Sequence, residues 1–215
     1  MYYKRLRLLL LSLCCLTCFI ETQAQKDTRA RQILDRTAAI FAQGGVQVSF
    51  SIQTNTPGSA SMKGTILIKG DKFQLETPST ITWFDGKTQW SYLVDNQEVN
   101  ISNPTPEELQ NINPYSFIGL YKKGYQYHIG PLKQYKGNNI TEINLQAENP
   151  QQNIQHATLY VSNKDGQPFF IKITDCNKNT NSIEINSLKK GLNLPDNRFV
   201  FDKKKYPQAE IIDLR

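Results

Sequence analysis

Residues 81–92 read ITWFDGKTQWSY, and this stretch holds both tryptophans of the 215-residue chain, one on each side of an Asp-Gly pair. Asp-Gly between two β-prone runs is a strong signal for a hairpin with a two-residue loop. Such a loop pairs Phe84 with Lys87 and Ile81 with Trp90. Because directly paired residues point to the same side of a sheet, one face is predicted to carry mostly large apolar side chains: Ile81, Trp83, Thr88, Trp90 and Tyr92.

A period of two extends outward from this hairpin in both directions. Apolar and polar residues alternate over 46–53, 62–69, 72–76, 99–101, 125–129, 143–147, 157–161, 169–173 and 183–185. This alternation is typical of antiparallel strands with one buried and one solvated face. Residues 163–166, with the sequence NKDG, look like a hairpin turn between two of these runs. We therefore expect a mainly β (α+β) protein of about ten strands.

Helical segments are predicted at two places. Apolar residues recur at helical spacing over 28–43, where Asp27 or Thr28 can cap the start and Gly44-Gly45 ends the helix. Residues 103–124 interrupt the alternation with three prolines. There we expect two short helices, at 106–111 and 114–121.

The width of the predicted sheet suggests how it closes. Ten strands at about 4.8 Å each span about 48 Å, whereas a helix with its side chains is about 10 Å across. Three helices cannot cover a flat sheet of that width. We therefore expect a curled sheet, an incomplete antiparallel β-barrel (half-barrel), with the N-terminal amphipathic helix and the short helices as a lid. The curl either contains a solid core or encloses an apolar cavity that binds apolar ligands.

If there is a cavity, its candidate lining comes from the apolar positions of the strands nearest the tryptophan hairpin. These are Phe50, Ile52, Ile66, Ile68, Phe73, Leu75, Ile81, Trp83, Trp90 and Tyr92. The candidate lid residues are Ile33, Leu34, Ile40, Phe41, Ile118 and Leu120.

The first 24 residues have the layout of a secretory signal peptide. A basic start, MYYKRLR, precedes an apolar run of thirteen residues, and Thr22 and Ala24 are suitable at −3 and −1. We therefore predict a signal peptide at 1–24, cleavage after Ala24, and one exported domain at 25–215. Cys18 is an alternative site of lipid attachment, although Cys15-Leu16-Thr17 departs from the Leu at −3 and the Gly or Ala at −1 of bacterial lipoboxes.

No catalytic or metal-binding pattern stands out. Cleavage leaves Cys176 as the one cysteine, so an internal disulfide is excluded. The histidines, His128 and His156, have no neighbours at metal-ligand spacing, and the chain contains neither GxSxG nor HExxH. We expect no enzyme activity, no metal and no cofactor.

The charge pattern is equally unspecialised. The formal net charge is +6, and the lysines at 122–123, 189–190 and 203–205 are scattered. A solvated surface explains them, with weak attraction to anionic membranes or acidic partners as the alternative. Nothing in the pattern indicates binding to nucleic acid.

The segment 64–99, GTILIKGDKFQLETPSTITWFDGKTQWSYLVDNQEV, resembles the outer-membrane lipoprotein carrier protein family (LolA-like). The resemblance rests on the order of Gly64, Phe73, Pro78, Asp85-Gly86-Lys87 and Trp90-x-Tyr92. The short segment NPYSFIGL and the ending RFVFDKKKYPQAEIIDLR are also similar to that family. Together these matches span most of residues 28–215.

This resemblance implies a half-barrel under a helical lid and a periplasmic chaperone for lipoproteins. Such a carrier takes acylated lipoproteins from an inner-membrane ABC lipoprotein exporter, shields their acyl chains as a monomer, and delivers them to an outer-membrane lipoprotein acceptor. The alternative is an envelope lipid- or glycolipid-binding sensor or structural module on the same fold. One departure from the family stands out. The turn after ILIK carries Lys69-Gly70-Asp71-Lys72, where typical carriers have an arginine that ties the sheet to the lid.

Overall fold

The computed structural model describes residues 27–55, 61–105, 108–109 and 119–215, which form one large sheet with one long helix. In chain order, the elements are α2 (Thr28–Ala42), β1 (Gly45–Thr54), β2 (Met62–Lys69), β3 (Lys72–Glu76), β4 (Thr80–Phe84), β5 (Gln89–Leu93), β6 (Glu98–Ser102), β7 (Tyr125–Ile129), β8 (Gln134–Tyr135), β9 (Asn138–Ala147), β10 (Ile154–Ser162), β11 (Pro168–Asp175), β12 (Thr180–Leu192), η2 (Asp196–Phe199) and β13 (Glu210–Asp213).

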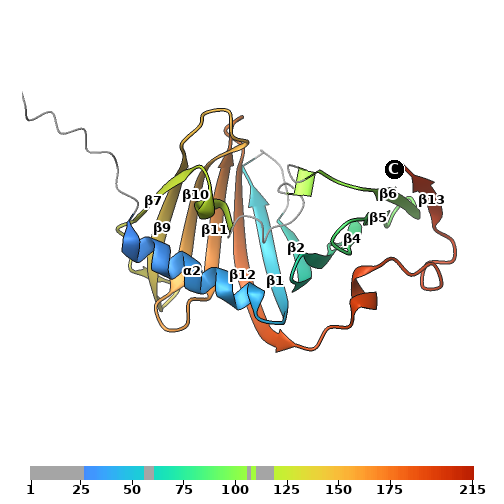
Figure 1. The fold of residues 1–215 in the computed structure, drawn as a ribbon, viewed down its shortest axis with the longest axis horizontal. Coiled ribbons are helices and arrows are strands. Elements are labelled where there is room, and N and C mark those ends of the chain that lie inside the picture. Colours follow the sequence, from blue (N-terminus) through green and yellow to red (C-terminus); the bar gives the residue numbers. More distant parts are fainter. Residues whose placement is uncertain (1–26, 56–60, 106–107, 110–118) are drawn as a thin grey trace, which may run out of the picture.

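The thirteen strands of the described chain form a single open sheet (Figure 1). Its order is β13-β6-β5-β4-β3-β2-β1-β12-β11-β10-β9-β7, with β8 paired to β9 off this path. Every pairing is antiparallel except that of β13 with β6, which is parallel. The edge strands are β13 and β7, and they do not pair with each other, so the sheet stays open. The prediction of an incomplete antiparallel barrel with an N-terminal helix is confirmed.

The helix α2 forms where the sequence pattern placed it. Asp27 caps it, since its Oδ1 accepts hydrogen bonds from the backbone N–H groups of Arg29 (2.8 Å) and Ala30 (3.1 Å). These backbone donors lower the pKa of the Asp27 carboxyl. Gly44, at φ +79°, lets the chain turn into β1. The buried side of α2 consists of Ala30, Ile33, Leu34, Thr37, Ile40 and Phe41.

The two faces of the sheet are covered differently. We call the side against which α2 packs the helix face, and its side chains join those of α2 in the main core. The opposite side is the strap face. The C-terminal strap, residues 193–209, leaves β12, carries η2 past β3 and β4, and brings β13 beside β6 (Figure 1). A smaller core lies there, built around Val99, Ile101 and Ala209.

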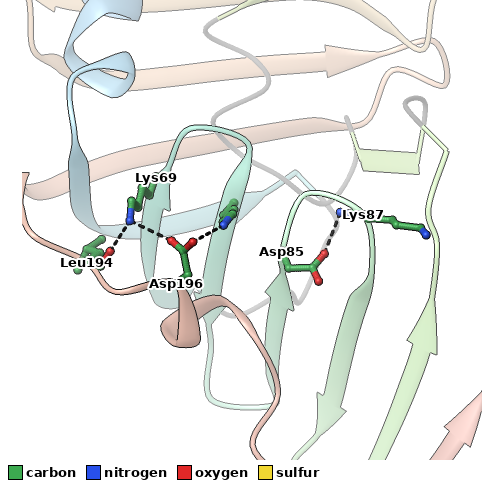
Figure 2. Close-up of polar contacts among 6 residues, drawn as sticks. Lys69, Asp85, Lys87, Leu194 and Asp196 are labelled. Carbon is green, nitrogen blue, oxygen red and sulfur yellow. Dashed lines mark hydrogen bonds and ion pairs between the residues drawn. The ribbon is translucent and has the colours of Figure 1, made fainter.

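The tryptophan hairpin is present, but its register differs from the predicted one. Trp83 pairs with Trp90 and Phe84 with Gln89, so the loop has four residues, 85–88, and not two. The carboxylate of Asp85 accepts a hydrogen bond from the backbone N–H of Lys87 at 2.9 Å (Figure 2). It also accepts one from the backbone N–H of Thr88 at 2.8 Å, and together these bonds favour the wider turn. Because the shift is two residues, each side chain keeps its predicted face relative to the rest of the hairpin.

Some predictions fall outside the described residues. The signal peptide, the three N-terminal cysteines, Ile118 and most of the two short helices at 106–111 and 114–121 lie there. Of the segment where the two short helices were predicted, residues 108–109 are helical and residues 119–122 form a 3-10 turn. In the part of the chain that the structure describes, no helix has the length and hydrophobicity needed to cross a membrane.

Candidate functional site

The helix face of β1–β3 is an apolar wall built from two rows of paired side chains. One row runs Val46–Ile68–Phe73–Phe84 across β1–β4. The other starts at Val48 and continues through Ile66 and Leu75 in β2 and β3. Most of these residues are buried, and Ile68 and Phe73 are each only 1% exposed.

A glycine fixes the position of the largest ring in this wall. Gly64 of β2 pairs with Phe50 of β1. A Cβ at Gly64 would lie 2.5 Å from Phe50 Cζ and 2.9 Å from the backbone oxygen of Glu76. The end of the Phe50 ring therefore occupies the space beside Gly64 on β2, from which any other side chain would displace it. Ile52, two residues along β1, is half-buried against the same core.

The lid residues that the structure describes share the main core with this wall, and α2 lies against β1, β2 and β7. Ile33, Leu34, Ile40 and Phe41 of α2 are buried in the main core, and Leu120 joins them. Polar tethers are sparse. The Thr37 hydroxyl contacts the backbone oxygen of Gly166 (2.9 Å).

The second tether joins the helix to the chain that precedes β7. The Tyr121 hydroxyl donates to Asp35 Oδ1 at 2.6 Å. Burial and this hydrogen bond raise the pKa of Tyr121 above its usual range. The helix is thus held by side-chain packing and few hydrogen bonds.

The tryptophans do not join this wall, which corrects the expectation that all ten residues line one cavity. Ile81, Trp83, Trp90 and Tyr92 lie on the strap face, because Glu76 pairs with Ile81 while Leu75 pairs with Thr82. The strap covers them. The Trp83 ring lies 5.6 Å from the rings of both Phe201 and Tyr206, and Tyr206 lies 4.7 Å from Tyr92. The predicted set therefore divides into a helix-face group of six and a strap-face group of four.

The lysine pair after β2 holds the strap to the sheet (Figure 2). Lys69 Nζ donates to the backbone oxygen of Leu194 (2.7 Å) and to Asp196 Oδ1 (2.9 Å), while Lys72 Nζ lies 2.8 Å from Asp196 Oδ2. The hydrogen bonds from Lys72 and Lys69 lower the pKa of Asp196 to about 2. This turn ties the sheet to the strap through two point charges and has no guanidinium fork.

The described residues offer no metal site. Nowhere in those segments do three or more His, Cys, Asp or Glu side chains gather in a way that could hold a metal ion. His128 and His156 are exposed on β7 and β10. Cys176 is an exposed thiol in the β11–β12 turn.

Comparison with known families decides the relationship. The family model described as "Outer membrane lipoprotein carrier protein LolA" matches residues 20–177. The chain belongs to this LolA family. Proteins of the family are periplasmic and in general are not enzymes. No curated protein matches the sequence of this LolA-like chain.

Solved structures share the fold of this LolA-like chain at low sequence identity. An uncharacterized conserved protein from Thermus thermophilus is 14% identical with a TM-score of 0.58, over 86% of this chain and 99% of that one. A DUF1329 family protein from Desulfovibrio piger is 9% identical with a TM-score of 0.50, over 81% and 97%. A LolA superfamily protein from Nitrosomonas europaea is 16% identical with a TM-score of 0.44, over 80% and 97%. The likenesses to the Thermus thermophilus and Desulfovibrio piger proteins concern the fold alone.

Sequence reasoning missed two groups that matter in the LolA-like structure. Phe84 belongs to the helix-face wall, and Phe201 and Tyr206 cover the tryptophans. The three-residue turn between β3 and β4 determines on which face of the sheet the Phe84 side chain lies. Alternation within a strand shows which residues share a face, but not which of the two faces it is. The strap aromatics lie more than a hundred residues from Trp83, so no local pattern connects them.

Proposed function

We propose that this protein is a periplasmic carrier that binds the acyl chains of lipoproteins against its helix face and moves them from the inner to the outer membrane. The observation that carries the proposal is the apolar wall of β1–β3 beneath a sparsely tethered amphipathic helix, in a chain of the LolA family. The ligand-contacting group in this proposal is Phe50, Ile52, Ile66, Ile68, Phe73 and Leu75, with Ile33, Leu34, Ile40, Phe41 and Leu120 as the lid.

Hydrophobic transfer supplies enough free energy for such a role. Each CH₂ group shielded from water contributes about 0.8 kcal/mol, so a chain of fourteen carbons contributes about 11 kcal/mol before association costs. Access requires the lid to move, since Phe73 is only 1% exposed. The acyl chains then replace the contacts of α2. The main costs are the polar tethers at Thr37 and Tyr121 and the hydrogen bonds between Asp27 and β7.

Cargo loading and release need partners in this proposal. A ligand held by apolar burial leaves only for a site that buries it equally well. An inner-membrane ABC lipoprotein exporter would supply the cargo, and an outer-membrane lipoprotein acceptor would take it. The carrier itself performs no bond chemistry.

Calorimetric titration tests the binding step. The protein is purified from the periplasm of the expression host and titrated with a triacylated lipopeptide and its deacylated twin. We expect saturable binding of the acylated form alone. Leu75→Asp places a charge on the helix face at a half-buried position and should weaken binding at least tenfold. Ile211→Asp, on exposed β13, is the matched control and should leave it unchanged.

Two results would count against the proposal. Equal heats from both peptides would mean that the acyl chains are not recognised. Equal losses in Leu75→Asp and Ile211→Asp would mean that the helix face is not the site. A second experiment separates a carrier from a sensor or structural module. A carrier moves a fluorescent lipopeptide from donor to acceptor vesicles, whereas a sensor binds it without increasing the transfer rate.

A further inference from the structure

The helix face changes character at β4. The first apolar row ends at Phe84 in β4 and becomes polar in β5 and β6, and the second row becomes polar from β4 onward. The first row runs from Phe84 to Gln89 and Ser102, and the second runs from Leu75 to Thr82, Ser91 and Asn100. One end of an otherwise apolar wall therefore presents hydroxyl and amide groups, although Phe84 of β4 and Leu93 of β5 add apolar side chains to the same face. We call Thr82, Gln89, Ser91, Asn100 and Ser102 the polar rows.

Gln89 is the member of the polar rows that points to a ligand. Its side chain is 8% exposed, and its Nε2 donates to Ser91 Oγ at 3.0 Å. Its Oε1 is buried and has no hydrogen-bond partner in the part of the chain that the structure describes. A buried acceptor without a donor is costly, and most such groups in folded proteins are satisfied. The neighbouring Phe84, which pairs with Gln89, cannot supply a donor.

The orientation of Ser91 adds a second requirement. Its oxygen already accepts from Gln89, so its hydroxyl hydrogen is available to another acceptor. The pair thus offers one acceptor, Gln89 Oε1, beside one donor, the Ser91 hydroxyl. In an extended amino-acid residue, the backbone N–H and the carbonyl of the same residue point to the same side. An N-acylated amino acid presents this complementary pair and carries its acyl chain on the nitrogen.

We propose that Gln89 and Ser91 recognise the amide linkage of an N-acylated amino acid, with the amide N–H on Gln89 Oε1 and the residue's carbonyl on the Ser91 hydroxyl. This inference rests on the proposed function and adds the chemical class of its ligand. The acyl chain extends from Gln89 along Phe84 and Phe73 to the apolar wall. A lipid joined by esters alone has no N–H to offer, so the site discriminates between amide and ester linkages.

A matched pair of ligands tests this discrimination. One is a short N-palmitoyl peptide, and the other is its ester analogue, in which an oxygen replaces the amide N–H. Both are titrated calorimetrically into the periplasmically purified protein. We expect the amide to bind about tenfold more tightly, the contribution of one buried hydrogen bond. Gln89→Leu should remove this preference while retaining ester binding.

Gln47→Leu is the control variant, since Gln47 is a half-buried glutamine on the strap face of β1. It should keep the tenfold preference. Equal affinity of the wild-type protein for amide and ester overturns the inference while leaving the carrier function standing. Preference retained in Gln89→Leu also overturns it. Failure of both acylated ligands to bind refutes the proposed function and this inference with it. The comparison of amide and ester affinity in the wild-type protein needs no variant. The inference therefore remains testable even if Gln89→Leu fails to fold.

Discussion

Gly64→Ala is the sharpest test of how the apolar wall is packed. The new Cβ would lie 2.5 Å from Phe50 Cζ and 2.9 Å from the backbone oxygen of Glu76. The ring can turn away only into neighbouring core side chains, and the backbone contact persists whatever the ring does. Gly64 does not have a positive φ, so alanine adds no backbone strain of that kind. The whole effect is therefore steric.

Overpacking of this sort costs about 1–3 kcal/mol. At about 2 kcal/mol the melting temperature of a domain this size falls by roughly 4–8 °C. Urea denaturation followed by circular dichroism measures the loss. Gly119→Ala is the control, because no atom of the described residues lies within 4 Å of a Cβ there.

The double variant locates the clash. Phe50→Leu removes the ring atoms nearest the new methyl group, so its destabilisation and that of Gly64→Ala should sum to more than the loss in the double variant. Strict additivity would show that the Phe50 ring does not lie over Gly64. A fully stable Gly64→Ala protein would refute the packing of the wall itself.

Three further predictions concern the tethers and the strap. Asp196→Asn should lower the melting temperature at neutral pH. The difference from wild type should persist above about pH 4 and vanish as the pH falls toward 2. The reason is that the wild-type carboxylate has a pKa of about 2 in the folded protein and about 3.9 in the unfolded chain. A difference in melting temperature that is constant with pH would contradict this. Thr37→Val removes a fully buried hydroxyl that contacts the backbone oxygen of Gly166, and should cost about 1–2 kcal/mol by urea denaturation; an unchanged midpoint would contradict the tether. Tyr206→Ala should expose Trp83, shifting its emission to the red and raising acrylamide quenching, while lipopeptide affinity stays within twofold; a tenfold loss of affinity would place the ligand on the strap face.

The local sequence pattern predicted much of the fold, because helices and strands depend on residues close together in the chain. The period of 3.6 and the cap at Asp27 located α2, and the period of two located the strands. The pairing of Trp83 with Trp90 on one face followed from alternation even though the loop length was wrong, since a shift of two residues preserves the face.

The site was predicted less well because it depends on contacts between distant segments. The side of the sheet that each hairpin presents is set by turns such as 77–79, where Thr77 bonds to Thr80 and fixes the phase of β4 against β3. Asp196 lies more than a hundred residues from Lys69, so the sequence marked the lysine turn as a departure from the family without identifying its partner in the strap. Gln89 looked like a routine polar position, and only its burial beside Phe84 distinguishes it.

Paramagnetic broadening tests the central claim, that acyl chains bind on the helix face, most directly. The protein, labelled at isoleucine methyl groups, is mixed with a lipopeptide that carries a nitroxide on its acyl chain. We predict broadening of the methyl signals of Ile52, Ile66 and Ile68, with those of Ile81 and Ile101 on the strap face unchanged. Broadening of Ile81 and Ile101 without the helix-face set, or of neither set at saturating ligand, would contradict the account.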